Sequence, residues 1–393
     1  MVSLVGVVGA GKWNKVTYIY KGKSYETDFA TYALYKLLEE DAIKFNKVVL
    51  FGTEESNWEI VQCDFGEKIT KVIIPEGRNE EEIGEITRIF FENIPEGEII
   101  LDLTHGHRHH PILLLLISSY LDLIGKSKIV HTYYAMVPFG ETQAEFFDLS
   151  LYLTIFKTFF GLEIFRTTFY SHKLEEVEEE LEEKAKNFKE KQALSEVRKV
   201  FRGIIGLSES LKINYAKQAI EKSETILKHA EKVKEIVEEK FPYFSPSLNL
   251  YLEEVSKIER LNGKSLWYSL LEFSKISLEK ERYTSTMVLL REGLLGYGCY
   301  KLSACENKVC AQEIACSKPE LRKRITGLLD GMARKELMAP NHHIEEVSRI
   351  YSEIQQLRNA MSHAFIQKNP PNIKETRNKI ENIQNKYENL VES

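Results

Sequence analysis

The chain has 393 residues, 43% of them hydrophobic, which predicts two or three domains with buried cores. Its formal net charge of −6 argues against a general polyanion-binding protein, because such proteins gain most of their affinity from basic charge, and we expect no stable DNA binding. The sequence has neither a charged and apolar leader nor about 18 uninterrupted apolar residues, so we expect a cytoplasmic protein that does not bind membranes.

Strand and helix signals alternate from residue 1 to about residue 150. The expected strands are Leu4–Val8, Val16–Tyr20, Tyr25–Phe29, Lys47–Phe51, Ile69–Ile74, Glu98–Leu103 and Lys128–Val137, and the expected helices are Thr31–Glu40, Asn79–Asn93 and Pro111–Ile124. The second and third strands flank Lys21–Ser24, a sequence typical of a hairpin turn. Strands that alternate with helices predict a parallel, Rossmann-like α/β sheet.

Only helical patterns follow Asp148. They run from Leu149 to Lys240, break at Phe241–Pro246, and resume as far as Leu390. We therefore predict three parts: residues 1–150 as an α/β domain, 151–246 as a helical linker or scaffold, and 247–393 as an all-α domain.

Four of the five cysteines lie close together, from Cys299 to Cys316. The intervals between them are five, four and five residues, whereas zinc sites commonly use pairs separated by two residues. We expect free or structural thiols, with disulfides as the alternative and a metal site as the least favoured interpretation.

Three predicted strands end in loops rich in small and polar residues: Gly9–Asn14, Gly52–Asn57 and Asp102–Arg108. In open α/β sheets, ligands bind beyond the carboxyl ends of the strands. The third loop precedes a helix, whose first N–H groups suit a phosphate, with Arg108 and nearby histidines adding positive or proton-donating groups. Trp13 has a ring that can stack on a base. These features favour an anionic ligand.

Other interpretations of the same loops are weaker. Gly6–Lys12 fits the phosphate-binding pattern GxxxxGK, but Trp13 replaces the Ser or Thr that holds magnesium. A dinucleotide fold lacks its third glycine, since Asn14 occupies that position. Four histidines crowd into His105–His110, so a metal site or a simple polar helix cap remains an alternative, although their spacing is not that of regular metal ligands.

A late helical segment carries Arg358, Asn359 and His363. At about 100° per residue Arg358 and His363 lie about 140° apart, whereas Asn359 and His363 share a face. An imidazole moves protons near neutral pH, and a guanidinium stabilises charge on a phosphate. These groups favour metal-free cleavage of RNA by its own 2′-OH, at a site completed by a second copy of the helix; an ordinary solvated helix face is the alternative.

Arg358-Asn359-x-x-x-His363 resembles the motif of HEPN ribonucleases, and Asp102-x-Thr104-His105-Gly106 is similar to a motif on the fourth strand of CARF domains. Together they resemble the CARF–HEPN ribonucleases of type III CRISPR systems. The resemblance implies a homodimer with a CARF domain, a HEPN domain, and a cyclic oligoadenylate, commonly the tetra-adenylate, bound across the two-fold axis.

The resemblance also assigns residues on this chain. The implied ligand contacts are Gly9, Ala10, Gly11, Lys12, Trp13, Asn14, Thr53, Thr104, His105, Gly106, His107, Arg108 and His131. Some members of this family degrade their own activator, and Trp13, Asn14 and His131 are the candidates for that step here. His131 lies on a predicted strand, where a packed structural histidine is the alternative interpretation.

The expected function is a single-stranded RNA endoribonuclease that is activated by cyclic oligoadenylate and needs no metal cofactor. His363 would act as general acid or base, Arg358 would stabilise the phosphorane, and Asn359 would position one of them. Two alternatives belong to other classes. One is a ligand-responsive nucleic-acid-binding regulator, for which we find no convincing helix-turn-helix, and the other is an enzyme that only degrades the cyclic messenger.

Overall fold

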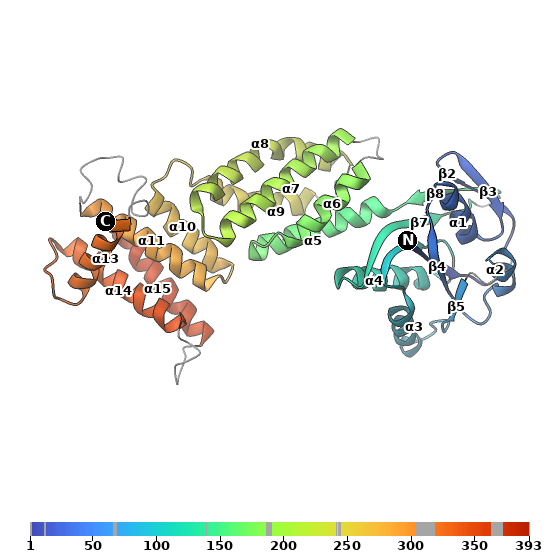
Figure 1. The fold of residues 1–393 in the computed structure, drawn as a ribbon, viewed down its shortest axis with the longest axis horizontal. Coiled ribbons are helices and arrows are strands. Elements are labelled where there is room, and N and C mark those ends of the chain that lie inside the picture. Colours follow the sequence, from blue (N-terminus) through green and yellow to red (C-terminus); the bar gives the residue numbers. More distant parts are fainter. Residues whose placement is uncertain are drawn as a thin grey trace. The chain divides into compact units, whose positions relative to one another are not determined.

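A computed structural model describes residues 2–11, 13–65, 69–138, 140–185, 191–240, 242, 245–302, 319–362 and 372–392 (Figure 1). The chain divides into two compact units, Met1–Leu153 and Thr154–Ser393. This division falls close to the predicted end of the first domain at residue 150. The further boundary near residue 246 stays a prediction. Among the residues described, no helix is long and apolar enough to cross a membrane.

The first unit is built on one eight-stranded sheet in the order β3-β2-β8-β7-β6-β1-β4-β5. Its strands are β1 (Val2–Val8), β2 (Val16–Tyr20), β3 (Lys23–Thr27), β4 (Phe45–Gly52), β5 (Ile69–Ile73), β6 (Gly97–Asp102), β7 (Ser127–Ala135) and β8 (Gln143–Asp148). The five strands from β7 to β5 are parallel, while β8 runs antiparallel to β7 and β2–β3 is an antiparallel hairpin. The predicted Rossmann-like sheet and its hairpin are therefore confirmed.

Helices cover both faces of this sheet because neighbouring strand residues point to opposite sides. Leu4 and Leu50 pack with α1 (Ala30–Glu40) and α2 (Trp58–Phe65), whereas Val5 and Val49 pack with α3 (Glu80–Asn93) and α4 (His109–Leu123). The central strand β1 is consequently buried along its whole length, whereas the edge strand β5 is only partly covered. This arrangement leaves the carboxyl edge of the sheet as the place where loops meet.

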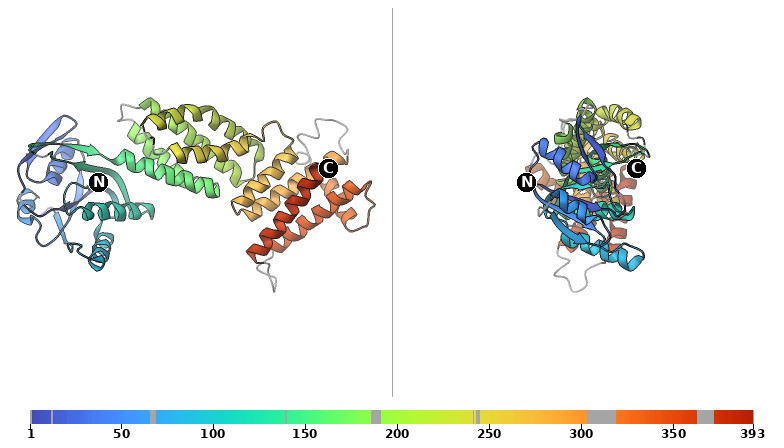
Figure 2. Two further views of the ribbon diagram at one scale, coloured as in Figure 1. Left: turned by 180° about the vertical axis from the view of Figure 1, so that it is seen from behind. Right: turned by 90° about the vertical axis from the view of Figure 1, so that its right-hand side faces the viewer.

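The second unit is entirely helical in its described residues. Its helices are α5 (Ser150–Thr168, which begins in the first unit), α6 (His172–Ala185), α7 (Lys191–Lys212), α8 (Ala216–Lys240), α9 (Ser245–Glu259), α10 (Leu266–Glu279), α11 (Tyr283–Lys301), α13 (Pro319–Ala333), α14 (His342–Ser362) and α15 (Ile373–Glu392). Figure 2 shows α10, α11, α14 and α15 side by side. The predicted all-helical second half is confirmed.

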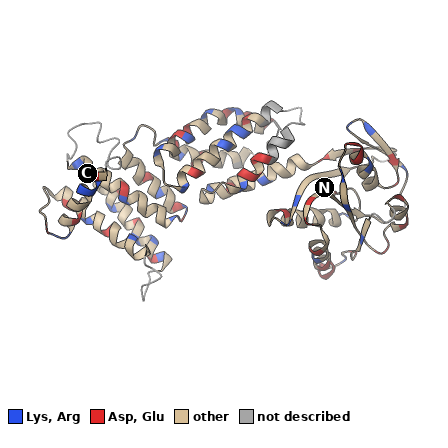
Figure 3. Ribbon diagram, viewed as in Figure 1, with Lys and Arg blue, Asp and Glu red and all other residues tan. Residues whose placement is uncertain are grey.

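Two apolar cores stabilise this helical unit. One joins α5–α9 and includes Phe165, Ile204 and Val255, while the other joins α10–α15 and includes Leu294 and Tyr351. Helix α10 contributes to both, with Phe273 in the first core and Leu271 in the second. Basic and acidic residues are interspersed along the helices of this unit (Figure 3).

The prediction missed two elements, α2 and β8. Helix α2 was detectable, since its buried residues Trp58, Val61 and Phe65 recur at helical spacing. Strand β8 has a weak signal, because Phe147 at an outward position is half exposed and breaks the alternation of apolar and polar residues. Helix α4 also begins two residues before Pro111, which the first turn tolerates because its N–H groups lack intrahelical acceptors.

Candidate functional site

The loop that follows β4 holds the loop that follows β1. The backbone N–H of Asn57 donates to the carbonyl of Gly9 at 3.1 Å, and its side-chain amide donates to the carbonyl of Gly11 at 2.7 Å. The Ser56 hydroxyl donates to the carbonyl of Val8 at 2.9 Å. Asn57 and Ser56 are thus positioning residues that the sequence reasoning did not single out, although both lie in a predicted ligand loop.

Two glycines let the loops after β1 and β6 approach each other. Gly106 has a φ of +101°, and a Cβ there would lie 2.6 Å from Cγ1 of Val7. A Cβ on Gly9 would come within 3.3 Å of the Gly106 nitrogen. The structure therefore brings all three predicted ligand loops together, because the loop after β1 contacts both the loop after β4 and the loop after β6.

Asp102 anchors the loop that follows β6. The carboxylate is buried and accepts hydrogen bonds from the hydroxyls of Thr31 at 2.6 Å and Thr104 at 2.5 Å, and from the Thr104 N–H at 3.0 Å. Burial raises the pKa of Asp102 and these hydrogen bonds lower it. The effect of burial is larger, so the pKa lies above its ordinary value. The Thr104 hydroxyl in turn accepts the N–H of Ala135 at 3.0 Å, so it ties the end of β7 to the loop.

Trp13 and His105 belong to a cluster of three rings. Trp13 stacks on Phe29 and on His105, with ring centroids 5.1 and 4.8 Å apart. His105 Nε2 accepts the N–H of Ala30, the first residue of α1, at 3.1 Å, and burial lowers its pKa to about 4. His105 is consequently neutral at pH 7 and acts as a helix acceptor. Stacking of Trp13 on a base stays a prediction.

The other histidines join the loop after β5 to the start of α4. Nε2 of His109 and Nε2 of His110 each donate to the carbonyl of Glu76, at 2.7 and 3.1 Å. Burial lowers the pKa of His110 to about 4. Within the described part of the chain, no group of three or more His, Cys, Asp or Glu side chains is arranged to hold a metal ion.

His107 and Arg108 are exposed where α4 begins. Arg108 forms no ion pair with any other described residue, and the first N–H groups of a helix attract anions. Gly9, Ala10, Gly11 and Asn14 lie in the loop after β1, on the same edge of the sheet, and Lys12 lies outside the described residues. Together these groups form the most favourable place for an anion in the first unit.

A groove of about 520 Å³ lies beside this edge, next to Thr53, but its lining does not suit an anion. It is lined by five glutamates, Glu54, Glu55, Glu76, Glu82 and Glu85, with Arg78 as the one basic residue. The Thr53 side chain is buried, and its hydroxyl lies 3.2 Å from that of Ser56. Thr53 therefore supports the loop internally, and its contact with a ligand stays a prediction.

His131 lies apart from the loops. It is four residues before the end of β7, which is about 13 Å at 3.3 Å per residue. Its Nδ1 is 3.2 Å from Oδ2 of Asp148, whose other oxygen accepts the N–H of Ser150 at the start of α5. Burial raises the pKa of Asp148, but the bonds with His131 and Ser150 leave it below the ordinary value. The structure does not bring His131 together with Trp13 and Asn14.

The predicted catalytic residues lie at the end of α14. Arg358 and Asn359 are exposed in its last turns, and neither forms an ion pair or side-chain hydrogen bond with another described residue. His363, the next residue in the sequence after Ser362, lies outside the described residues. The helix itself is held by Ile354 and Leu357, which are buried in the second core of the helical unit.

Comparison with known protein families decides the nature of the first unit. Residues 2–138 match the model of the CARF domain of the CRISPR system endoribonuclease Csx1. The chain contains a CARF domain. The matched residues include every strand of the sheet except β8, together with the three loops described above, and the match confirms the resemblance seen at Asp102-x-Thr104-His105-Gly106.

A structural comparison extends over most of the chain but is distant. Csm6 from Enterococcus italicus bound to cyclic hexa-2'-fluoro-hexa-dAMP is 12% identical, covers 99% of this chain and 93% of its own, and has a TM-score of 0.42. No curated protein matches the sequence.

Proposed function

We propose that the protein is a metal-independent, single-stranded RNA endoribonuclease of CRISPR antiviral defence, activated by cyclic oligoadenylate. The observation that carries this proposal is the match of residues 2–138 to the CARF domain of an endoribonuclease. Arg358, Asn359 and His363 on the following helical unit support it, because they provide a phosphate ligand and a proton-transfer group.

The activator binds at the carboxyl edge of the CARF sheet. Its phosphates lie against the backbone of Gly9–Gly11 and the start of α4, where Arg108 has no other described charge partner. Trp13 and Asn14 flank the bases. We propose the tetra-adenylate as this ring, because the resemblance to CARF–HEPN ribonucleases implies it as the common activator.

The proposal requires a homodimer, and one face of α4 supports it. Ile112, Leu116 and Tyr120 recur every fourth residue and are 59%, 58% and 50% exposed, with Leu123 and Ile124 extending the same apolar stripe. An exposed apolar stripe of this kind is typical of an interface. Two copies that pair through the same face form an isologous, two-fold contact next to the ligand loops.

The proposed cleavage follows from the chemistry of the Arg358, Asn359 and His363 side chains. His363 takes the proton of the RNA 2′-OH or supplies one to the departing 5′-oxygen, and Arg358 stabilises the negative charge on the phosphorane. Asn359 precedes His363 by four residues in the sequence and positions its imidazole. The products are a 2′,3′-cyclic phosphate and a 5′-OH. Together they contain every atom of the RNA, so the first step consumes no water molecule and the proposed mechanism uses no metal.

The test is cleavage of a fluorescent single-stranded RNA in excess chelator, with and without cyclic tetra- or hexa-adenylate. We expect activator-dependent cleavage that falls by a factor on the order of 10²–10⁴ in His363→Ala and Arg358→Ala. Arg349→Ala removes an exposed arginine of the same helix that pairs with Glu346, and should cleave normally. Undiminished cleavage by both active-site variants would overturn the proposed site. Loss of activator without RNA cleavage would indicate degradation of the messenger instead.

A further inference from the structure

A charged cluster that the sequence reasoning did not use connects α11 and α13. Arg291 Nη1 lies 2.8 Å from Oε1 of Glu292, and Arg322 Nη2 lies 2.5 Å from the same oxygen. The two arginines and one glutamate are 19%, 34% and 16% exposed, so the cluster is largely withdrawn from water. The three side chains together carry one excess positive charge.

The guanidinium of Arg291 has unused hydrogen-bonding capacity. Its Nη2 donates to the Tyr351 hydroxyl at 3.3 Å, and the guanidinium carbon lies 5.9 Å from the centre of the Tyr351 ring. Its Nε is buried and has no hydrogen-bond partner in the described structure. A positive cluster with an unpaired buried donor is costly for a purely structural network, but suits a site that receives an anion.

The cluster lies along the same helix as the proposed catalytic arginine. Tyr351 and Arg358 are seven residues apart on α14, which corresponds to about 700° of rotation and about 10 Å of rise. Two full turns are 720°, so Arg358 projects from nearly the same side of the helix as Tyr351. Arg291 contacts Tyr351 from this side, and Lys323 and Arg324 are exposed next to Arg322 on α13.

We propose that Arg291, Glu292 and Arg322 form a binding subsite for a phosphate of the RNA strand, adjacent to the scissile phosphate at Arg358. This inference rests on the proposed ribonuclease function and assigns a second point of contact to its substrate. Arginine offers planar pairs of donors to phosphate oxygens, and Glu292 holds both guanidinium groups in place. The contact is to the backbone, so it is independent of base sequence.

The first variant to test is Arg322→Ala, because Arg322 is the more exposed arginine of the cluster. Binding of a single-stranded RNA with 2′-deoxy substitutions, which cannot be cleaved, is measured by fluorescence anisotropy across salt concentrations on the full-length protein with activator. Loss of one phosphate contact should reduce the slope of log K against log salt by about 0.7. With cleavable RNA, KM should rise about tenfold while kcat changes little, since the contact is kept in both ground and transition states.

Matched variants separate the possible outcomes. Arg349→Ala, which also removes one arginine, should leave the salt slope unchanged. Arg291→Met tests the second arginine, with the melting temperature measured in parallel. An unchanged slope in both cluster variants, with or without a lower melting temperature, would overturn the subsite and leave a structural ion pair. A reduced slope in a protein that cleaves no RNA would support the subsite and overturn the proposed ribonuclease.

Discussion

At the scale of single residues, His105 is a predicted ligand contact whose side chain packs inside the protein. Its ring stacks on Trp13, and its Nε2 accepts the N–H of Ala30. Burial lowers its pKa from 6.5 to about 4, so the folded protein binds this proton more weakly than the unfolded chain does. The resulting stability is fully present above pH 6.5 and is lost as the pH falls towards 4.

We therefore expect the melting temperature of the CARF domain to fall between pH 6.5 and pH 4. The contribution of His105 to the free energy of unfolding over this range is up to about 3 kcal/mol. His105→Gln keeps an acceptor for Ala30 and removes the titration, so its melting temperature should vary less with pH. His172→Gln replaces an exposed histidine and should retain the wild-type profile. Identical pH profiles for all three proteins would contradict this assignment.

The same residues show how far a sequence can predict a site. The ligand loops follow from the rule that ligands bind at the carboxyl edge of a parallel sheet, and the glycines in them follow from the need for close backbone approach. The inward role of His105 and the bonds from Asn57 to Gly9 and Gly11 depend on contacts between distant segments. Local sequence does not reveal such contacts, because histidine and asparagine are suited both to contacting a ligand and to supporting a loop from within the protein.

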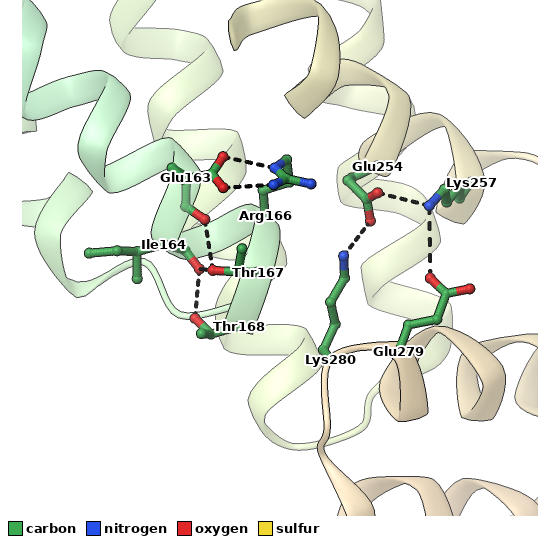
Figure 4. Close-up of polar contacts among 9 residues, drawn as sticks. All are labelled: Glu163, Ile164, Arg166, Thr167, Thr168, Glu254, Lys257, Glu279 and Lys280. Carbon is green, nitrogen blue, oxygen red and sulfur yellow. Dashed lines mark hydrogen bonds and ion pairs between the residues drawn. The ribbon is translucent and has the colours of Figure 1, made fainter.

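At the scale of elements, a buried ion pair joins α9 to the end of α10 (Figure 4). Glu254 lies 2.8 Å from Lys280 and 2.8 Å from Lys257, and the side chains of Glu254 and Lys280 are only 10% and 9% exposed. Lys280 also lies 5.5 Å from the ring centre of Phe169, at the end of α5. Three helices of the second unit thus meet around one charge pair.

Removal of one partner from this pair should destabilise the helical unit strongly. Glu254→Gln leaves the Lys280 ammonium buried without its counter-charge, and we expect a loss of about 3 kcal/mol, measured by urea unfolding of the helical signal. Glu279→Gln removes the exposed glutamate 3.8 Å from Lys257 and should change stability by less than about 0.5 kcal/mol. The double variant Glu254→Leu/Lys280→Met should recover much of the loss. Equal effects of the two single variants would contradict a buried pair.

Helix–helix arrangement was the part of the fold least accessible from sequence. Helical periodicity predicted helices from Leu149 to Lys240 and again after Pro246, because a helix on the surface of a core buries one apolar stripe. It did not predict that α10 contributes Phe273 to one core and Leu271 to the other. The core that each residue joins depends on which helices pack against its face of α10. Periodicity shows that a face is apolar but does not identify the helices that cover it.

At the scale of the whole molecule, the proposed function requires that ligand binding in the first unit changes the state of α14 in the second. Activator at 100 times its dissociation constant stabilises the state it binds by about 2.7 kcal/mol. It alters RNA cleavage only if it binds two arrangements of the chain with different affinity. Helix α5 is the covalent connection between the units, since it begins at Ser150 beside Asp148 and ends at Thr168.

Hydrogen exchange on the full-length protein, with and without cyclic tetra-adenylate, tests this coupling. We expect slower exchange in the loops after β1 and β6, together with altered exchange in α14 and at the end of α5. Arg108→Ala should abolish both effects, because it removes a proposed contact with the ligand phosphates. By reciprocity, a non-cleavable RNA should tighten activator binding by the same factor by which the activator tightens RNA binding. Protection confined to Met1–Leu153, with RNA affinity unaffected, would show that the CARF domain binds its ligand without controlling the helical unit.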